Sequence, residues 1–196
     1  MSDTAENLEK LLSGRNANEI YREGDFVHAS VMMILKESGQ GYSLLFIKRP
    51  DSDRDPFSGH MAFPGGRMES ADISKLETAI RETYEEVGIN INSSGRILGS
   101  LDDANPNNPR ARNYIVTPYL SVLNEEVTIK PDVREVEKTV WVPIHHLIDE
   151  RNSQVRIRER DGKEVEDYAY QYEQYIIWGM TGRILHQFLS FSTHLF

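Results

Sequence analysis

Three glutamates stand close together in residues 79–88, AIRETYEEVG. On a helix, positions 82, 85 and 86 are three and four apart, so Glu82, Glu85 and Glu86 share one side, where like charges repel. Carboxylate oxygens are the ligands that hard divalent cations prefer. Arg81 precedes them and could orient one carboxylate through bidentate hydrogen bonds. The segment is therefore either a solvated acidic surface or a site for a cation.

Local signals place these carboxylates on a helix. Ser74, with Glu77 three residues later, forms a capping box that starts a helix, and Gly88 stands where a left-handed residue ends one. One apolar side is formed by residues at helical spacing: Leu76, Ile80, Thr83, Tyr84 and Val87. We expect this side to pack on a sheet and the three carboxylates to lie roughly opposite it.

A pair of glycines, Gly65 and Gly66, precedes the helix in the sequence MAFPGGR. Because glycine has no Cβ, paired glycines let the backbone approach a ligand closely. Residues 49–60, RPDSDRDPFSGH, are a loop by their proline, aspartate and glycine content and lead into this step. The glycines therefore favour a cation site over a solvated acidic surface.

The elements around this segment are mainly strands. Strands are expected at residues 26–36, 42–49, 96–101, 114–123, 126–130 and 138–143. Residues 154–160 and 165–172 read as a hairpin, and residues 176–191 as an amphipathic helix. Strands with two longer helices to cover them favour an α+β sandwich.

The first residues differ from the rest of the chain. Leu8, Leu11 and Leu12 lie on one side of a short helix, and a polar link follows. We therefore divide the chain into an N-terminal helical extension at residues 1–24 and one domain at residues 25–196.

Composition limits the classes of function. The chain has 196 residues, 22 Lys and Arg against 31 Asp and Glu, and a net charge of −9. This balance argues against binding to nucleic acid or to an anionic membrane, both of which need a basic surface. Small anionic substrates remain compatible with it, because bound divalent cations reverse the local sign of charge.

The absence of cysteine is equally informative. A chain with 0 Cys has no disulfide, no thiolate zinc site and no cysteine nucleophile. The start, MSDTAENLEKLL, is acidic and polar, unlike a signal peptide, and no run approaches the roughly 20 apolar residues of a membrane span. We predict a cytoplasmic protein.

Residues 65–89 resemble the signature of the Nudix hydrolases. That signature runs Gly, five residues, Glu, seven residues, Arg-Glu, apolar, any, Glu-Glu, any, Gly, apolar. The residues in place are Arg81, Glu82, Glu85, Glu86, Gly88 and Ile89. Two positions depart from it: Thr83 replaces an apolar residue, and Asp72 replaces the first glutamate, with eight residues before Arg81. The role of Asp72 stays open. The resemblance implies a Nudix-type α/β/α sandwich with a central mixed β-sheet.

The resemblance also implies a reaction, the hydrolysis of a nucleoside diphosphate linked to another moiety. Its cofactor would be Mg²⁺ or Mn²⁺, held by Glu82, Glu85 and Glu86. The backbone of Gly65 and Gly66 would lie against metal and phosphates. Arg81 would brace the glutamates. The general base would be a box glutamate or one from a later loop, for which Glu135 is the candidate.

Further residues resemble the coenzyme A pyrophosphatase branch of the family. This branch has FPGG before the box, as in residues 63–66, and Arg49, Arg54 and Gly59 match its upstream motif in type. Four residues instead of three separate Arg54 from Gly59. The resemblance implies that both arginines bind substrate and that coenzyme A is cleaved to 4′-phosphopantetheine and 3′,5′-ADP.

Other functions stay open beside coenzyme A hydrolysis. The same fold could cleave ADP-ribose, a dinucleotide or an oxidised nucleoside triphosphate. It could also be a Nudix-like module that binds a nucleotide without catalysis, although intact Glu82, Glu85 and Glu86 argue against that. In the Asn/Pro-rich loop, Arg110 and Arg112 are either solvated or in contact with substrate.

Several aromatic residues and histidines have structural interpretations. His145 and His146 are adjacent and cannot share a helix face, so we expect surface or capping roles. Alternating tyrosines mark one face of a strand, in the core or at a contact between two subunits of a homodimer: Tyr168, Tyr170 and Tyr172. Helix-spaced residues near the end are expected in the core: Trp178, Met180, Ile184 and Phe188.

Overall fold

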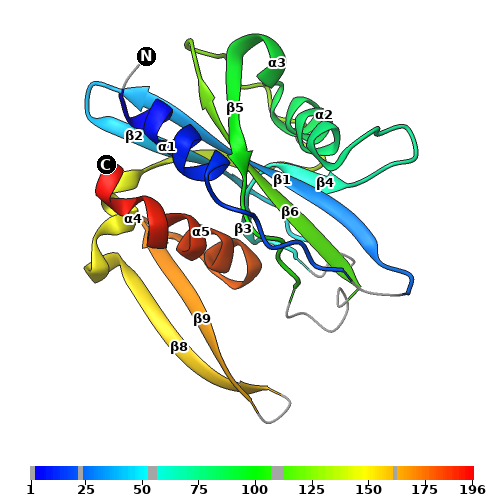
Figure 1. The fold of residues 1–196 in the computed structure, drawn as a ribbon, viewed down its shortest axis with the longest axis vertical. Helices are drawn as coiled ribbons and strands as arrows, with labels where there is room; N and C mark the ends of the chain where they lie inside the picture. The colour runs from blue at the N-terminus through cyan, green and yellow to red at the C-terminus, as the bar shows by residue number, and fades with distance from the viewer. Residues whose placement is uncertain (1–2, 22–23, 53–56, 107–112, 161–162) are drawn as a thin grey trace.

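A mixed β-sheet forms the centre of the fold (Figure 1). The computed structural model describes residues 3–21, 24–52, 57–106, 113–160 and 163–196. The strands of the sheet are β1 Val27–Ser38, β2 Gly41–Lys48, β3 Met61–Ala62, β4 Gly65–Arg67, β5 Gly95–Ser100, β6 Tyr114–Leu123 and β7 Lys138–Pro143. Their order is β3-β2-β1-β6-β5, with β4 paired to β1 and β7 to β2. The β1–β6 pair is parallel and the others are antiparallel.

The central strands are apolar on both faces because both faces are covered. Successive side chains of a strand point to opposite faces. In β1, Met33 and Leu35 belong to one buried cluster, while Met32 and Ile34 belong to the other. This explains why the strand reads as a continuous apolar run instead of an alternating one.

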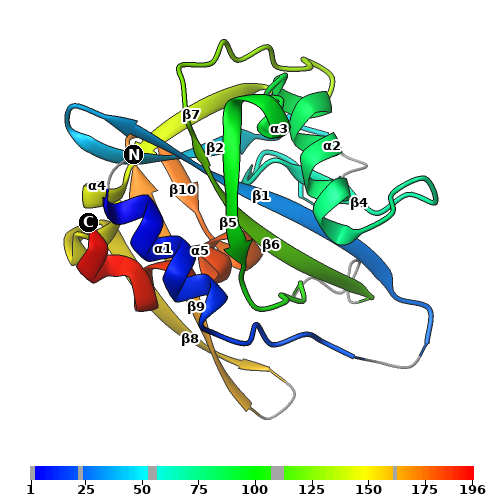
Figure 2. The ribbon, with the colours of Figure 1, turned by 45° about the horizontal axis from the view of Figure 1, so that its top comes forward.

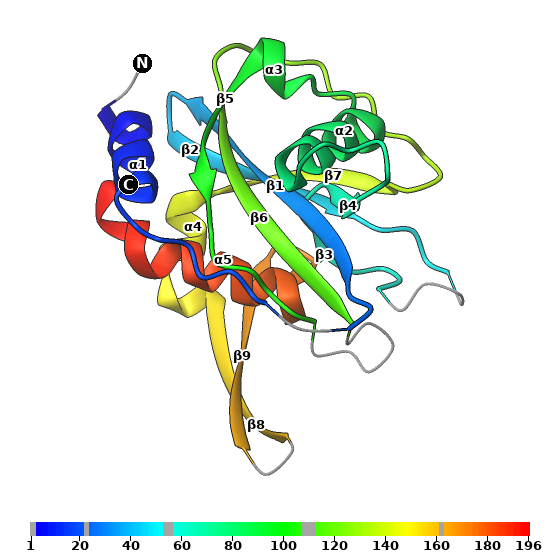
Figure 3. The ribbon, with the colours of Figure 1, turned by 45° about the vertical axis from the view of Figure 1, so that its right-hand side comes forward.

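Helices cover the two faces of the sheet. The helices are α1 Asp3–Ser13, α2 Lys75–Val87, α3 Ile91–Ser94, α4 Ile144–Ile148 and α5 Gly179–Ser192, with 3₁₀ turns at Glu150–Asn152 and Thr193–Leu195. Figure 3 shows α2 on one side of the sheet and α1 and α5 on the other. The predicted α/β/α sandwich with a central mixed sheet is confirmed.

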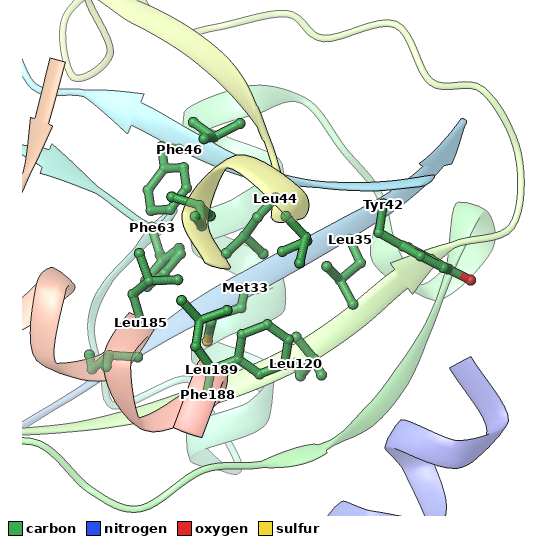
Figure 4. Packing of buried hydrophobic residues seen from close by; sticks show 14 of the residues in the cluster. Met33, Leu35, Tyr42, Leu44, Phe46, Phe63, Leu120, Leu185, Phe188 and Leu189 are labelled. Atoms are coloured by element: carbon green, nitrogen blue, oxygen red, sulfur yellow. The ribbon is translucent and has the colours of Figure 1, made fainter. Parts of the chain in front are cut away.

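The larger core cluster lies between the sheet and α5 (Figure 4). Leu185 and Phe188 of α5 are fully buried. The rings of Phe46 and Phe63 stack with their centroids 4.8 Å apart. Phe63 stands directly before the Pro-Gly-Gly step, so this packing anchors the segment that carries the glycines.

The N-terminal helix packs on the same core. Leu8 and Leu12 are buried, and Gly99 of β5 allows a close approach, since a Cβ there would lie 2.8 Å from the Cβ of Leu12. The Thr4 hydroxyl donates to the carbonyl of Leu195 at 3.2 Å, and Figure 2 shows α1 beside the C-terminal turn. The helix expected from the leucine spacing is confirmed.

A second sheet completes the fold. It contains β8 Ser153–Arg160, β9 Lys163–Tyr172 and β10 Tyr175–Ile177, and the β8–β9 hairpin extends from the body of the molecule (Figures 1 and 3). The predicted hairpin is confirmed, while its turn at residues 161–162 lies outside the described residues. Tyr170 is buried and Tyr168 and Tyr172 pack against the same cluster, which confirms their expected place in the core. A contact between subunits stays a prediction.

Two expected elements differ from the structure. Residues 126–130 form no strand in the segment 124–137, all of which is described: Val127 and Ile129 pack near α2, but the Lys130 N–H donates to the carbonyl of Val87 at the end of α2 instead of to the sheet.

The last helix also begins later than expected. Residues 176–177 belong to β10, and Gly179, with φ +65°, marks the change of direction into α5. Ile184 and Phe188 are buried as expected, but Trp178 is 42% exposed and Met180 is only partly buried. In the part of the chain that the structure describes, no helix has the length and apolar character needed to cross a membrane.

Candidate active site

The capping signals set the ends of α2 as expected. The Ser74 hydroxyl accepts a hydrogen bond from the Glu77 N–H at 3.1 Å, and the Glu77 carboxylate accepts one from the Ile73 N–H at 2.5 Å. At the other end Gly88 has φ +72° and donates to the carbonyl of Tyr84 at 2.9 Å. These contacts fix which residues of the helix face the glycine step.

A buried carboxylate holds Arg81 in place. The Nε and Nη2 atoms of Arg81 each donate to one oxygen of Asp72 at 2.9 Å. Asp72 is 7% exposed and also accepts from the Thr78 hydroxyl at 2.9 Å and the Glu69 N–H at 2.8 Å. The hydrogen bonds from Arg81 hold the pKa of Asp72 well below its usual value. The role left open for Asp72 is thus to position Arg81.

Arg81 in turn contacts two of the three glutamates. Its Nη1 atom donates to Glu82 at 2.9 Å and to Glu85 at 3.1 Å, and Nη2 also donates to the carbonyl of Arg67 at 3.0 Å. A guanidinium with a fixed planar fork can satisfy these acceptors together. The contact with Arg67 lies outside what the sequence could indicate, because a backbone carbonyl is present in every residue type.

The three glutamates differ in their exposure to solvent. The side chain of Glu85 is 55% exposed and that of Glu82 is 13% exposed, whereas Glu86 is 1% exposed. The expectation that all three lie opposite the packed side is wrong for Glu86. It stands three residues after Thr83 and next to Val87, both buried, and so shares their face of the helix.

The burial of Glu86 changes its acidity. The Gly65 N–H donates to the Glu86 carboxylate at 2.8 Å. Burial raises the pKa of Glu86 to about 8, although that hydrogen bond and the positive charge of Arg49 act in the opposite direction. Burial also raises the pKa of Glu82, against the effect of Arg81. A positive charge beside these carboxylates would favour their ionised forms.

Both glycines are required by their surroundings. At Gly65, with φ +153°, a Cβ would lie 2.2 Å from the carbonyl oxygen of Ser30 in β1. At Gly66 a Cβ would lie 2.4 Å from the carboxyl carbon of Glu82. The first glycine therefore lets β4 pair with β1, and the second lets the Glu82 carboxylate lie against the backbone.

The loop after residue 130 places Glu135 near the helix. The Asp132 N–H donates to the carbonyl of Glu86 at 3.0 Å and so ties the loop to the end of α2. Glu135 is exposed, and its charge raises the pKa of both Glu82 and Glu86, which places its carboxylate in their vicinity. Arg49, just after β2, is close enough to lower the pKa of Glu86. Residues from three parts of the chain thus surround the glycine step.

The remaining candidates are three arginines and two histidines. Arg54, Arg110 and Arg112 lie outside the described residues. The Nε2 atom of His146 lies 2.8 Å from the carbonyl oxygen of Gln171 in β9, so this histidine links α4 to the second sheet, a structural role as expected. His145 is exposed.

The donor chemistry of the group fits a hard divalent cation. Such ions prefer oxygen ligands, and Glu82, Glu85, Glu86 and the carbonyl of Gly66 offer them. Burial disfavours the ionised forms of Glu82 and Glu86 and so raises their pKa values, and a bound cation would offset this cost. In the described part of the chain no three acidic or histidine side chains converge into a preformed cluster, and Arg81 engages the Glu82 and Glu85 carboxylates.

Fold and site together define a Nudix hydrolase. The family model described as NUDIX domain matches residues 26–166, and the chain belongs to this family of enzymes that act on pyrophosphate bonds and generally use divalent metal ions. It is 32% identical over 143 residues to the uncharacterized Nudix hydrolase NudL of Photorhabdus laumondii, covering 73% of this chain and 74% of that one. It is also 32% identical over 126 residues to the peroxisomal coenzyme A diphosphatase ndx-8 of Caenorhabditis elegans, covering 62% of this chain and 51% of that one.

Solved structures share the fold at low sequence identity. A MutT/nudix family protein from Enterococcus faecalis matches 96% of this chain and 69% of its own with a TM-score of 0.56 and 17% identity. The NUDIX domain of Shewanella oneidensis NrtR, crystallised with ADP ribose, matches 64% of this chain and 79% of its own with a TM-score of 0.50 and 17% identity.

The raised pKa of Glu86 predicts a pH-dependent stability in protein stripped of divalent cations. Between the ordinary value of 4.5 and the folded value of about 8, the native state binds a proton that the unfolded state does not. The resulting stabilisation is fully present below pH 4.5 and is lost as the pH rises through about 8. Urea unfolding in EDTA at several pH values should show this fall. In Glu86→Gln, whose amide does not titrate, the fall should be smaller, and equal slopes would contradict the prediction.

The close approach at Gly66 predicts a loss of activity in Gly66→Ala. The new methyl group would displace the Glu82 carboxylate, so we expect kcat for a pyrophosphate substrate to fall about 10²-fold or more, while the far-UV spectrum is retained. Gly39→Ala is the matched control, because nothing lies within 4 Å of a Cβ at Gly39. Similar kcat values in the two variants would show that this approach is not needed.

Proposed function

We propose that this chain hydrolyses the pyrophosphate bond of coenzyme A to give 4′-phosphopantetheine and 3′,5′-ADP. The observation that carries the hydrolytic part is the set of glutamates ordered by Arg81 and Asp72 beside Gly65 and Gly66. The substrate is supported by the similarity to the coenzyme A diphosphatase of C. elegans and by the FPGG step at residues 63–66.

Glu82, Glu85, Glu86 and the carbonyl of Gly66 would hold the cation, Mg²⁺ or Mn²⁺. Such a cation, when bound, neutralises the pyrophosphate and lowers the pKa of a water molecule. Arg81 keeps the Glu82 and Glu85 carboxylates on the substrate side of α2 through its contacts with both. Asp72 acts through Arg81 and is a positioning residue.

In the reaction the oxygen of water forms a bond to one phosphorus, and the bond between that phosphorus and the bridging oxygen breaks. The bridging oxygen leaves on the second phosphate with the electron pair. A carboxylate must accept the proton of the attacking water. Glu135 is our candidate for this carboxylate. It is exposed, it lies in the loop that is hydrogen-bonded to the end of α2, and its charge acts on Glu82 and Glu86.

Two arginines would contact the phosphates. Arg49 lies beside Glu86, where its charge can pair with phosphate oxygens. Arg54 is proposed for the same role from its spacing to Arg49 alone. Coenzyme A carries a 3′-phosphate that ADP-ribose lacks, so an arginine near the ribose would distinguish the two by a charge-assisted hydrogen bond.

ADP-ribose hydrolysis is the second candidate. The NUDIX domain of NrtR, which shares the fold, was crystallised with ADP ribose. This supports a site of suitable shape for a nucleoside diphosphate on the fold, and the substrate comparison below separates the two candidates.

The cation site predicts a matched pair of results. Glu85→Gln should lower kcat by about 10²-fold or more, because a proposed carboxylate ligand is lost, and it should leave the protein folded, because the Glu85 side chain is 55% exposed. Glu126→Gln, at a glutamate whose side chain is 79% exposed and pairs with Lys36 far from the site in sequence, should retain activity. Activity should also require added Mg²⁺ or Mn²⁺. Full turnover of Glu85→Gln, or of wild type in excess EDTA, would argue against the site.

Substrate choice is tested by kcat/KM for coenzyme A, dephospho-coenzyme A and ADP-ribose. We expect coenzyme A to be the best substrate and its dephospho form to be poorer. Arg54→Ala should reduce the difference between these two, because it removes one partner of the contact with the 3′-phosphate. If ADP-ribose is preferred tenfold or more, the coenzyme A assignment is wrong and the enzyme is a more general nucleotide pyrophosphatase.

A further inference from the structure

Aromatic rings from two distant segments meet at His60, directly before β3. The ring of Trp178, at the start of α5, lies against the ring of His60, with centroids 4.6 Å apart. The ring of Phe57 meets His60 edge-on, with centroids 6.2 Å apart. Trp178 nevertheless remains 42% exposed. A tryptophan that packs on a neighbour and still presents much of its surface to solvent is suited to contact a flat ligand.

A backbone hydrogen bond connects His60 to Arg49, which is one of the proposed phosphate-binding residues. The Arg49 N–H donates to the carbonyl of His60 at 3.0 Å, so His60 is the next rung of the β2–β3 ladder. Five residues lead from His60 to Gly65, whose N–H contacts Glu86. Five residues of fully extended chain span at most about 18 Å. This bounds the distance between the backbone of His60 and that of Gly65, and so places His60 near the glycine step.

The order of groups matches the order of parts in a nucleoside diphosphate. Glu86 and the glycines mark the place for the pyrophosphate, Arg49 is close enough to Glu86 to lower its pKa, and the Arg49 backbone bonds to His60, whose ring meets that of Trp178. Figure 3 shows β3 next to β4, below α2, which agrees with this sequence of contacts. Bases stack on aromatic side chains without needing a particular hydrogen-bond pattern.

We infer that Trp178, supported by His60, is a stacking surface for the nucleobase of the substrate. The inference rests on the proposed hydrolysis of a nucleoside diphosphate but not on the choice of coenzyme A. It makes Trp178 a residue that sets affinity for substrates with a base. If Trp178 served only to cover β3, its removal would lower stability and leave KM unchanged.

Steady-state kinetics with the preferred nucleotide substrate test this role. Trp178→Ala should raise KM about 5- to 100-fold with kcat within about twofold, the range expected for loss of one stacked base. Trp178→Phe should restore most of the affinity, because a phenyl ring still stacks. Ile176→Ala is the matched control, since Ile176 is 51% exposed in the neighbouring strand β10. An unchanged KM in Trp178→Ala, or an equal rise in Ile176→Ala, would overturn the inference.

Binding measured by fluorescence keeps this test independent of hydrolysis. The chain has 2 Trp residues, so Trp141→Phe leaves Trp178 as the sole tryptophan. AMP should quench its emission in a saturable way, whereas ribose 5-phosphate, which lacks the base, should not. Quenching by AMP in a protein that cleaves no coenzyme A would uphold the stacking role and refute only the proposed substrate. Equal responses to AMP and ribose 5-phosphate, or none to either, would refute the stacking role itself.

Discussion

The contact between Arg81 and Asp72 is the constraint on which the site depends. Both oxygens of the buried carboxylate accept from the guanidinium, and its other donors reach Glu82 and Glu85. Removing one partner of a buried charged pair leaves the other uncompensated, which is strongly destabilising. Asp72 is also bonded to the Thr78 hydroxyl within α2, so the pair fixes the glycine-to-helix connection as well as the direction of the glutamates.

The carboxylate of Glu86 is accommodated differently from those of Glu82 and Glu85. Glu82 accepts a hydrogen bond from Arg81, whereas Glu86 accepts one from the Gly65 N–H and lies on the packed face of α2, where burial raises its pKa to about 8. A side chain at residue 65 would collide with β1. The backbone N–H that donates to Glu86 therefore belongs to a glycine. Ionisation of Glu86 therefore lowers the stability of the folded protein, and a bound cation would offset this loss.

Local signals were sufficient for α2, because capping and the left-handed glycine act within a few residues. Ser74 and Gly88 end the helix where the sequence predicts. Strands β1, β2, β5, β6 and β7 also followed from their apolar runs, whereas the short strands β3 and β4 were not expected. The burial of Glu86 could not be predicted, since it depends on the packing of α2 against the glycines of β4. The role of Asp72 could not be predicted either, because its partner Arg81 is nine residues away and only the turn before α2 brings the two side chains together.

The two elements that were predicted wrongly are both explained by the backbone. Residues 126–130 carry a strand-like pattern, but the Lys130 N–H donates to the carbonyl of Val87 at the end of α2, where helix carbonyls need partners. Trp178 fits a helical apolar spacing, but Gly179 starts the helix after it and leaves the ring beside His60. In both cases the spacing of apolar side chains predicts an element that the backbone hydrogen bonds or dihedral angles do not form. Both differences concern residues that we assign to function. The bonds at the end of α2 hold the loop that carries Glu135, and the late start of α5 leaves the Trp178 ring exposed for the nucleobase.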